Sequence, residues 1–155
     1  MTKFYDARGN IYAVVSPQAL REAGIALPTS ADACAASRQH WSEAAIALCC
    51  DWPEGQRPAN GKPHRSDGLL IGPFQASAPF DVLIVNTDGS LAERSGNGLT
   101  IFSQALTEQG LMAEQGAMLR VHHDKGEALE TAVTPAQVEG VRGFWLDLGQ
   151  PKFGP

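Results

Sequence analysis

The stretch Asn86–Phe102 (NTDGSLAERSGNGLTIF) decides the fold of this chain, because it holds a turn, a short extended piece and the start of a helix in one run. The Asp-Gly pair at 88–89 is a strong signal for a hairpin turn. Within 98–109, apolar residues recur at spacings of three and four, which predicts a helix with one apolar face. The residues on that face are Leu99, Phe102 and Leu106.

The glycine-rich segment Ser95-Gly96-Asn97-Gly98 lies just where this helix should begin. Glycine lets a backbone approach a ligand closely. The first turn of a helix carries unpaired N–H groups and a partial positive charge, which attract a carboxylate or a phosphate. A glycine-rich helix cap that binds no ligand would have the same sequence pattern. This segment alone therefore leaves both a ligand site and a purely structural cap open. The phosphate-loop pattern Gly-x-x-x-x-Gly-Lys-Ser/Thr and the hydrolase pattern Gly-x-Ser-x-Gly are absent from the sequence.

Outward from this stretch, the sequence alternates strand-like and helix-like segments. Ser16-Pro17 predicts the start of a short helix that ends near Gly24, and the alanine-rich range 31–50 is mostly helical. Range 51–66 holds three prolines and two glycines and predicts a long loop. The expected strands form a hairpin at 3–16, single strands at 69–71 and 80–85, a second hairpin from 118–122 and 129–133, and a last strand at 144–148. The fold class is α+β, with strands in hairpins packed against one well-marked helix.

Composition limits the classes of partner. The 155 residues are 43% hydrophobic and carry a net charge of −5, so the chain should form a core and lacks the basic patch that nucleic-acid or membrane-surface binding needs. No apolar run approaches the ~20 residues of a membrane span. The N-terminus shows no run of signal-peptide length, so a cytoplasmic location is the default expectation.

Cysteine and histidine usage gives no sign of a metal site or a disulfide framework. Cys34, Cys49 and Cys50 make an odd count without Cys-x-x-Cys spacing, so buried thiols in a reducing compartment are expected, with a reactive role for the adjacent pair as the alternative. His122 and His123 are neighbours on an expected strand and should point to opposite faces, which disfavours one shared metal ion.

Some residues have both a functional and a structural interpretation. His64 and Arg65 would reach a substrate carboxylate or lie in a solvated loop, and Glu93 would orient Ser95 or Asn97 or be an exposed strand residue. Arg8, next to Asn10, would contact an acidic substrate or have no such role. The tryptophans Trp41, Trp52 and Trp145 are expected to pack rather than to form a stacking platform.

Taken whole, the stretch 86–102 resembles the N-terminal half of diaminopimelate epimerase. The matching pattern is Asn86-x-Asp-Gly-Ser, then Ala92-Glu93, then x-Gly-Asn-Gly opening a helix. Other segments agree in order: Gly9-Asn10 followed by the aromatic Tyr12, Ser66-Asp67-Gly68-Leu69-Leu70, and Asp147-Leu-Gly-x-Pro151.

The resemblance implies a cofactor-independent enzyme of two similar lobes, each a mixed, mostly antiparallel sheet wrapped around a central helix. It implies an isomerase that binds an amino acid between the lobes, converting LL- to meso-diaminopimelate for lysine biosynthesis by removing and returning the α-proton. Asn10 and Asn86 would hold the polar groups of the substrate. The backbone of Gly96 and Asn97 would hold its α-carboxylate, where aligned N–H donors stabilise the charge that builds on proton removal.

Ser95 is a departure from that pattern, because the family has its first-lobe cysteine at this catalytic position. A hydroxyl is a far weaker acid than a thiol and needs an adjacent base. Ser95 would be a poor independent base, although it would still donate a hydrogen bond or relay a proton. The alternatives are therefore dehydration or another lyase reaction on the same scaffold, and a non-catalytic lobe that binds an amino acid or a partner.

The resemblance also predicts how the chain is organised. Residues 1–148 would form the N-terminal lobe, and 149–155, with two prolines and two glycines, would start a crossover linker to a second lobe absent from this chain. The expected partners are an amino acid and either a second lobe of the same protein or a second copy of the chain, in a possible homodimer.

Overall fold

The computed structural model describes residues 2–7, 9–52, 55–57, 59 and 63–147. Along the chain, the elements are β1 (Lys3–Ala7), β2 (Asn10–Val15), α1 (Pro17–Glu22), α2 (Ala31–Ala36), the 3₁₀ turn η1 (Arg38–His40), α3 (Ser42–Cys49), β3 (Gly68–Ile71), β4 (Phe80–Asn86), β5 (Leu91–Ala92), α4 (Gly96–Glu108), β6 (Ala117–His122), β7 (Leu129–Val138) and β8 (Val141–Asp147). The expected α+β class is confirmed.

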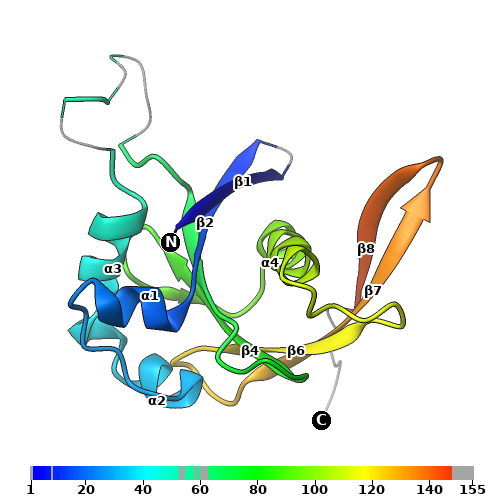
Figure 1. The fold of residues 1–155 in the computed structure, drawn as a ribbon. Coiled ribbons are helices and arrows are strands. Elements are labelled where there is room, and N and C mark those ends of the chain that lie inside the picture. Colours follow the sequence, from blue (N-terminus) through cyan, green and yellow to red (C-terminus); the bar gives the residue numbers. More distant parts are fainter. Residues whose placement is uncertain (1, 8, 53–54, 58, 60–62, 148–155) are drawn as a thin grey trace, which may run out of the picture.

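A single mixed sheet curls around helix α4. Its strands run in the order β1-β2-β3-β4-β6-β7-β8, and β5 pairs with β4 beside β6. The pairs β2–β3 and β4–β6 are parallel, whereas the other described pairs are antiparallel. Figure 1 shows α4 in the hollow of the sheet, between the β1–β2 hairpin and the β7–β8 hairpin, with α1, α2 and α3 on the other face. The predicted sheet wrapped around a central helix is therefore confirmed.

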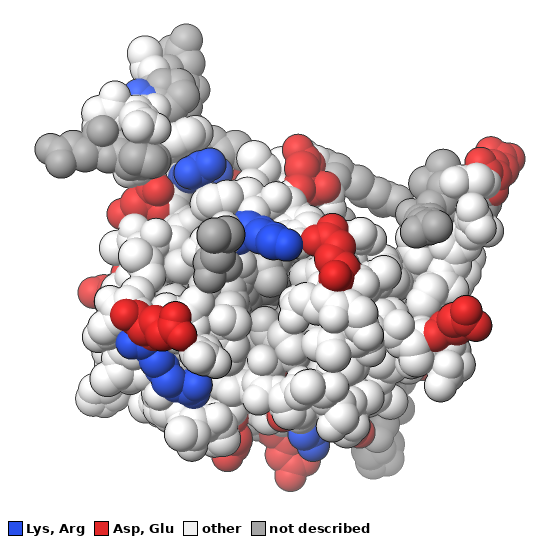
Figure 2. All heavy atoms as spheres, in the orientation of Figure 1, with Lys and Arg blue, Asp and Glu red and all other residues white. Residues whose placement is uncertain are grey.

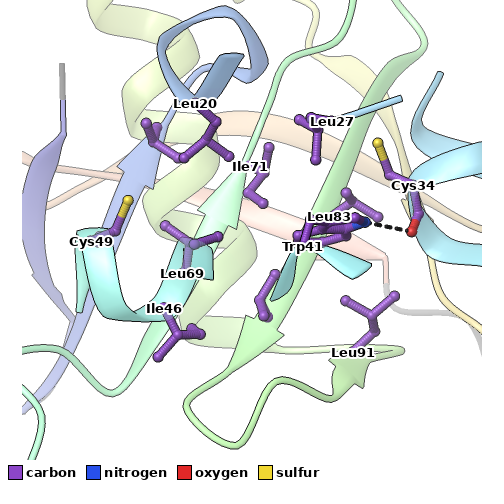
Figure 3. Packing of buried hydrophobic residues seen from close by; sticks show 14 of the residues in the cluster. Leu20, Leu27, Cys34, Trp41, Ile46, Cys49, Leu69, Ile71, Leu83 and Leu91 are labelled. Carbon is purple, nitrogen blue, oxygen red and sulfur yellow. Dashed lines mark hydrogen bonds between the residues drawn. The ribbon is translucent and has the colours of Figure 1, made fainter. Parts of the chain in front are cut away.

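Alternation along the central strands builds a core on each face of the sheet. Leu70 and Ile84 point toward α4, while Leu69 and Leu83 point toward the α1–α3 layer, because successive side chains of a strand point to opposite faces. Trp41 lies in the second core, where its Nε1–H donates to the backbone oxygen of Cys34 at 3.0 Å (Figure 3). The central strands are thus buried on both sides.

Local signals explain most helix boundaries. Ser16 caps α1 by accepting a hydrogen bond from the Ala19 N–H, and Pro17 occupies the first turn, as expected from the sequence. Ser30 caps α2 in the same way through the Ala33 N–H. Helix α4 begins at Gly96, two residues before the predicted start at 98. The shift places Gly96 and Asn97 inside the first turn of the helix.

Other expectations need correction. Trp145 was expected to pack, but it is 67% exposed, because it lies on β8, at the edge of the sheet. Strand β7 runs to Val138, five residues beyond the predicted end at 133, because it continues to pair with β8. Leu148 and the expected linker at 149–155 lie outside the described residues, as does Arg8. The division into a lobe at 1–148 and a linker stays a prediction.

The face shown in Figure 2 carries its charges singly or in small opposite-sign groups rather than as one basic patch. This distribution agrees with the net charge of −5. In the part of the chain that the structure describes, none of the helices combines the length and the apolar character that a membrane crossing requires.

Candidate active site

Ser95 is the N-cap of α4, the helix at the centre of the fold. Its backbone is extended, with φ −160° and ψ 111°, and its Oγ accepts a hydrogen bond from the Gly98 N–H at 2.9 Å. Because Gly98 has no side chain, the hydroxyl can lie over the first turn; a Cβ on Gly98 would sit 2.9 Å from Ser95 Oγ. The Ser-x-x-Gly spacing in the sequence therefore builds the cap and fixes the direction of the hydroxyl.

The backbone N–H groups of Gly96 and Asn97 have no acceptor among the residues that the structure describes. Gly96 is exposed, and a Cβ built on it would meet nothing within 4 Å. Unpaired N–H groups at a helix start attract a negative group, through both their hydrogens and the helix dipole. The geometry is thus suited to a carboxylate that approaches from solvent beside Ser95.

Tyr12, Gly68 and Asn86 stand in one row across β2, β3 and β4, paired residue to residue. The Tyr12 ring leans over Gly68, since a Cβ on that glycine would lie 2.7 Å from Tyr12 Cε1. The phenol oxygen of Tyr12 lies 3.0 Å from Ser95 Oγ. In the sequence, Tyr12 stood out only as an aromatic after Gly9-Asn10, and nothing there revealed the contact, which depends on how α4 packs on β2.

Asn86 ends β4, and its side chain is exposed. Its Nδ2 donates to Ser90 Oγ at 3.1 Å, so the amide is held by the turn and its Oδ1 is left as an acceptor. The turn itself is tied down by Asp88, whose Oδ1 accepts from both the N–H and the hydroxyl of Ser90. Asn86 is therefore in a position to accept a hydrogen bond from an ammonium group.

The helical layer fixes the turn that carries Asn86. The guanidinium of Arg38 donates to the Gly89 backbone oxygen at 3.1 Å and to Asp124 Oδ2 at 2.6 Å. Gly89 has φ +86°, and a Cβ there would lie 2.9 Å from Ser42 Oγ. These contacts connect η1 and α3 to the turn, and so link the outer layer to the candidate site.

Asn10 begins β2, two residues before Tyr12, so both side chains point to the same face of that strand. It is exposed. Asp67 holds the adjacent backbone: its Oδ2 accepts from the Ile11 N–H at 2.8 Å, and its own N–H donates to the Ile11 oxygen at 2.6 Å. Asp67 thus anchors β2 at Asn10, which gives the Ser-Asp-Gly segment a structural role.

The other charged candidates lie around this site rather than on Ser95. Glu93 Oε1 lies 3.8 Å from His123 Nδ1, and the Glu93 side chain is 45% exposed. Glu93 is therefore an exposed residue, and the described contacts do not include one with Ser95. Arg65 lies over the ring of Phe4, 4.1 Å from its centroid. His64 is 3.5 Å from Asp51 and lines a hollow of about 220 Å³ with Asp67 and Thr87, the residue after Asn86.

The two neighbouring histidines have separate partners. His122 Nε2 lies 2.7 Å from Asp81 Oδ1. His123 accepts from the Lys125 N–H at Nδ1, and its Nε2 is 2.9 Å from the Glu127 backbone oxygen. Each ring is therefore occupied by its own hydrogen bonds.

The cysteines are free and buried, as expected, and stand in the core on the α1–α3 side. Burial raises the pKa of Cys34 and of Cys50 to about 11, and it also raises the pKa of Cys49. These thiols are therefore protonated at neutral pH and take no part in the site around Ser95.

A mixed sheet wrapped around one helix, with a serine-capped, glycine-rich helix start open to solvent, is the arrangement expected of an epimerase-like lobe. The sequence is similar to curated diaminopimelate epimerases. It is 43% identical over 86 residues to diaminopimelate epimerase 2 of a Nostoc species, which covers 52% of this chain. It is 33% identical over 91 residues to diaminopimelate epimerase of Archaeoglobus fulgidus, which covers 57% of this chain. Over about half of its length, the chain thus resembles the diaminopimelate epimerase family.

The matching segments are short relative to those proteins. They span 29% of the length of both the Nostoc and the Archaeoglobus enzymes. A longer match, 27% identical over 116 residues, covers 75% of this chain and 37% of diaminopimelate epimerase of Heliobacterium modesticaldum. No protein-family model matches the chain. The activity and substrate of these relatives are therefore only proposals for this chain.

Proposed function

We propose that this chain is one lobe of a cofactor-independent amino-acid epimerase or racemase that removes and returns the proton on the α-carbon. Diaminopimelate, converted from the LL to the meso form in lysine biosynthesis, is the first candidate substrate, because the relatives are named for it. The observation that carries the proposal is the open start of α4. There, the unpaired N–H groups of Gly96 and Asn97 adjoin the Ser95 hydroxyl.

The chemistry explains why such a helix start is useful. Removing a proton next to a carboxylate places negative charge on that carboxylate, and donors already aligned with it lower the energy of the transition state. Gly96 and Asn97 would bind the α-carboxylate, with Ser95 directed at the α-carbon. Asn86 and Asn10 would hold the ammonium and the remaining polar groups. A single lobe covers one face of the α-carbon, so the opposite face would be covered by a second lobe or a second copy of the chain.

The test is α-proton exchange. The protein is incubated with LL-diaminopimelate in D₂O, and loss of the α-proton signal is followed by NMR. Ser95→Cys introduces the thiol that the family resemblance implies at this position and should raise the exchange rate by on the order of 10²-fold, the usual contribution of a competent acid–base group. Unchanged exchange in Ser95→Cys would refute the view that the hydroxyl limits the reaction.

Ser30→Cys is the matched control, because Ser30 also caps a helix through its hydroxyl but lies on α2. It should leave the exchange rate of the wild-type protein unchanged. A gain in both variants would point to thiol chemistry unrelated to the site.

A second candidate reaction is dehydration of a hydroxylated amino acid. The observation that favours it is the hydrogen bond between Ser95 Oγ and the phenol oxygen of Tyr12, because a pair of hydroxyls can deliver a proton to a leaving hydroxyl group. Product analysis separates the two reactions, since dehydration yields a keto acid after hydrolysis. Calorimetric binding of the amino acid with neither exchange nor keto acid would instead support a lobe that only binds.

A further inference from the structure

We propose that Tyr12 supplies and takes up the proton of this site through Ser95. The inference rests on the proposed function and deepens it, because it names the group that compensates for the missing thiol. The observation behind it is the 3.0 Å separation of the Tyr12 phenol oxygen and Ser95 Oγ, at the start of α4. A phenol is a much stronger acid than an alkyl hydroxyl, and tyrosine serves as a general acid or base in enzymes.

The hydrogen bonds of Ser95 leave one direction open for a relay. A serine hydroxyl has one hydrogen and two lone pairs, and the Gly98 N–H occupies one lone pair. When the Tyr12 phenol donates to the second lone pair, the Ser95 hydrogen is free to point at a ligand. When Ser95 instead donates to a Tyr12 phenolate, its second lone pair is free to receive a proton. Both states of a relay therefore fit the same geometry.

The Tyr12 ring is held in the orientation that this relay needs. It lies over Gly68, which offers no side chain to displace it. It is half-buried, on the α4 side of the sheet, with Val14, the next residue on that face of β2, in the core below. Asn86 is the next residue of the same row, so the proposed relay and the proposed substrate-binding amide lie on the same side of the sheet.

The charged and titratable groups around the phenol set its electrostatic environment. From β1, Tyr5 faces Tyr12, and its hydroxyl is bound to Glu108. Just before β3, the Asp67 carboxylate accepts a hydrogen bond from the Ile11 N–H. The first turn of α4 has no acidic residue, and the connection before it carries Glu93 and Arg94.

The proton step balances within the named groups. The Cα–H bond of the amino acid breaks, and its electron pair stays on the α-carbon, conjugated with the carboxylate. The proton passes to Ser95 Oγ as the Ser95 hydrogen passes to the Tyr12 phenolate. In the return step the phenol donates to Ser95, and Ser95 donates to the α-carbon. The phenol exchanges its proton with solvent between the two steps, so deuterium from D₂O appears at the α-carbon.

The test compares α-proton exchange of LL-diaminopimelate in D₂O across pH for the wild-type protein, Tyr12→Phe, Ser95→Cys and the double variant. Tyr12→Phe should lower the rate by on the order of 10²-fold at each pH, because the relay then has no phenol to take up or supply the proton. Ser95→Cys should keep most of its rate when Tyr12→Phe is added, because a thiol does not need the phenol.

The outcomes separate this inference from the proposed function. Equal rates and pH profiles in the wild-type protein and Tyr12→Phe, with exchange present, would overturn the role of Tyr12 and leave the function standing. Absence of exchange in every variant, Ser95→Cys included, would overturn both. Tyr5→Phe is the matched control: it removes a phenol hydroxyl that bonds to Glu108 at the far end of α4, and it should keep the wild-type pH profile.

Discussion

Tyr5 and Tyr12 face each other across the β1–β2 pair, yet their hydroxyls bond to opposite ends of α4. Tyr5 reaches Glu108, the last residue of the helix, at 2.6 Å, whereas Tyr12 reaches the N-cap Ser95 at 3.0 Å. Burial, together with the hydrogen bond to Glu108, raises the pKa of Tyr5 to about 12. One pair of cross-strand neighbours thus fastens the hairpin along the length of the central helix and brings a phenol to the candidate site.

The position of Tyr12 depends on the absence of a side chain at Gly68. In Gly68→Ala, the new Cβ would lie 2.7 Å from the ring and 3.3 Å from the Val85 backbone oxygen, so the ring must move away from Ser95. We expect destabilisation of about 1–3 kcal/mol, as for other overpacked sites, together with loss of the tyrosine-dependent exchange. Urea unfolding and the D₂O assay measure the two effects.

Gly143→Ala provides the control for that substitution, because a Cβ on this β8 glycine would meet nothing within 4 Å. Gly143→Ala should change the free energy of unfolding by less than about 0.5 kcal/mol and should leave the exchange rate unchanged. Full exchange in Gly68→Ala would show that the ring does not need its present position.

Ser95 has a structural role that can be separated from its chemical one. Replacing a capping serine by alanine costs about 1 kcal/mol, while glycine costs only a few tenths, because glycine leaves the cap accessible to water. We therefore expect Ser95→Ala to be less stable than Ser95→Gly in urea unfolding. Both variants should lose proton exchange equally, since neither has a hydroxyl. A higher exchange rate in the more stable Ser95→Gly than in Ser95→Ala would contradict a direct role for the hydroxyl.

The sequence predicted the parts of the fold that depend on local signals. Ser16-Pro17 marked the start of α1, and the apolar spacing of Leu99, Phe102 and Leu106 marked the buried face of α4. Strands β3 and β4 are buried on both faces and so lack an alternation of apolar and polar residues, but their continuous apolar runs were sufficient to predict them as strands. The length of β7 was not predictable in this way, because its last residues are held by pairing with β8 rather than by burial.

The candidate site could be predicted only in part from the sequence. The glycine-rich pattern places Ser95, Gly96 and Asn97 at a helix start, and the family resemblance adds their roles and those of Asn10 and Asn86. The contact of Tyr12 with Ser95 joins residues 83 positions apart and depends on the packing of β2 against α4. For the same reason the anchoring of β2 by Asp67, over a separation of 56 positions, was invisible from either segment.

Asp81 makes the stability of the protein depend on pH. Arg120 donates to both carboxylate oxygens, at 2.8 and 3.0 Å, and His122 approaches one of them at 2.7 Å. Burial acts to raise the pKa of Asp81, but the hydrogen bonds from His122 and Arg120 outweigh it and hold that pKa below its ordinary value of 3.8. A lowered folded-state pKa stabilises the fold above the unfolded pKa, and this contribution is lost as the pH falls through the folded pKa.

Asp81→Asn should therefore lower the free energy of unfolding by about 1.5–3 kcal/mol at pH 7, the range for hydrogen bonds to charged groups. The difference from the wild-type protein should shrink as the pH falls below 4, which urea unfolding at several pH values will show. Asp124→Asn is the control, because the Asp124 side chain is 29% exposed, against 13% for Asp81, and its ion pair should contribute less than about 1 kcal/mol. A difference for Asp81→Asn that does not change with pH would contradict the assignment.

Buried cysteines make thiol labelling a measure of unfolding. Cys34 and Cys50 are 0% exposed and Cys49 is 2% exposed, and their raised pKa values keep them as unreactive thiols at neutral pH. We expect a thiol reagent to label the native protein slowly, at a rate set by opening of the fold, and to label all three cysteines quickly in urea. The Ser30→Cys variant adds one exposed thiol that should react at once in the native state, as a standard within the same chain. Labelling of Cys49 or Cys50 in the native protein as fast as that added thiol would contradict their place in the core and support instead a reactive role for the adjacent pair.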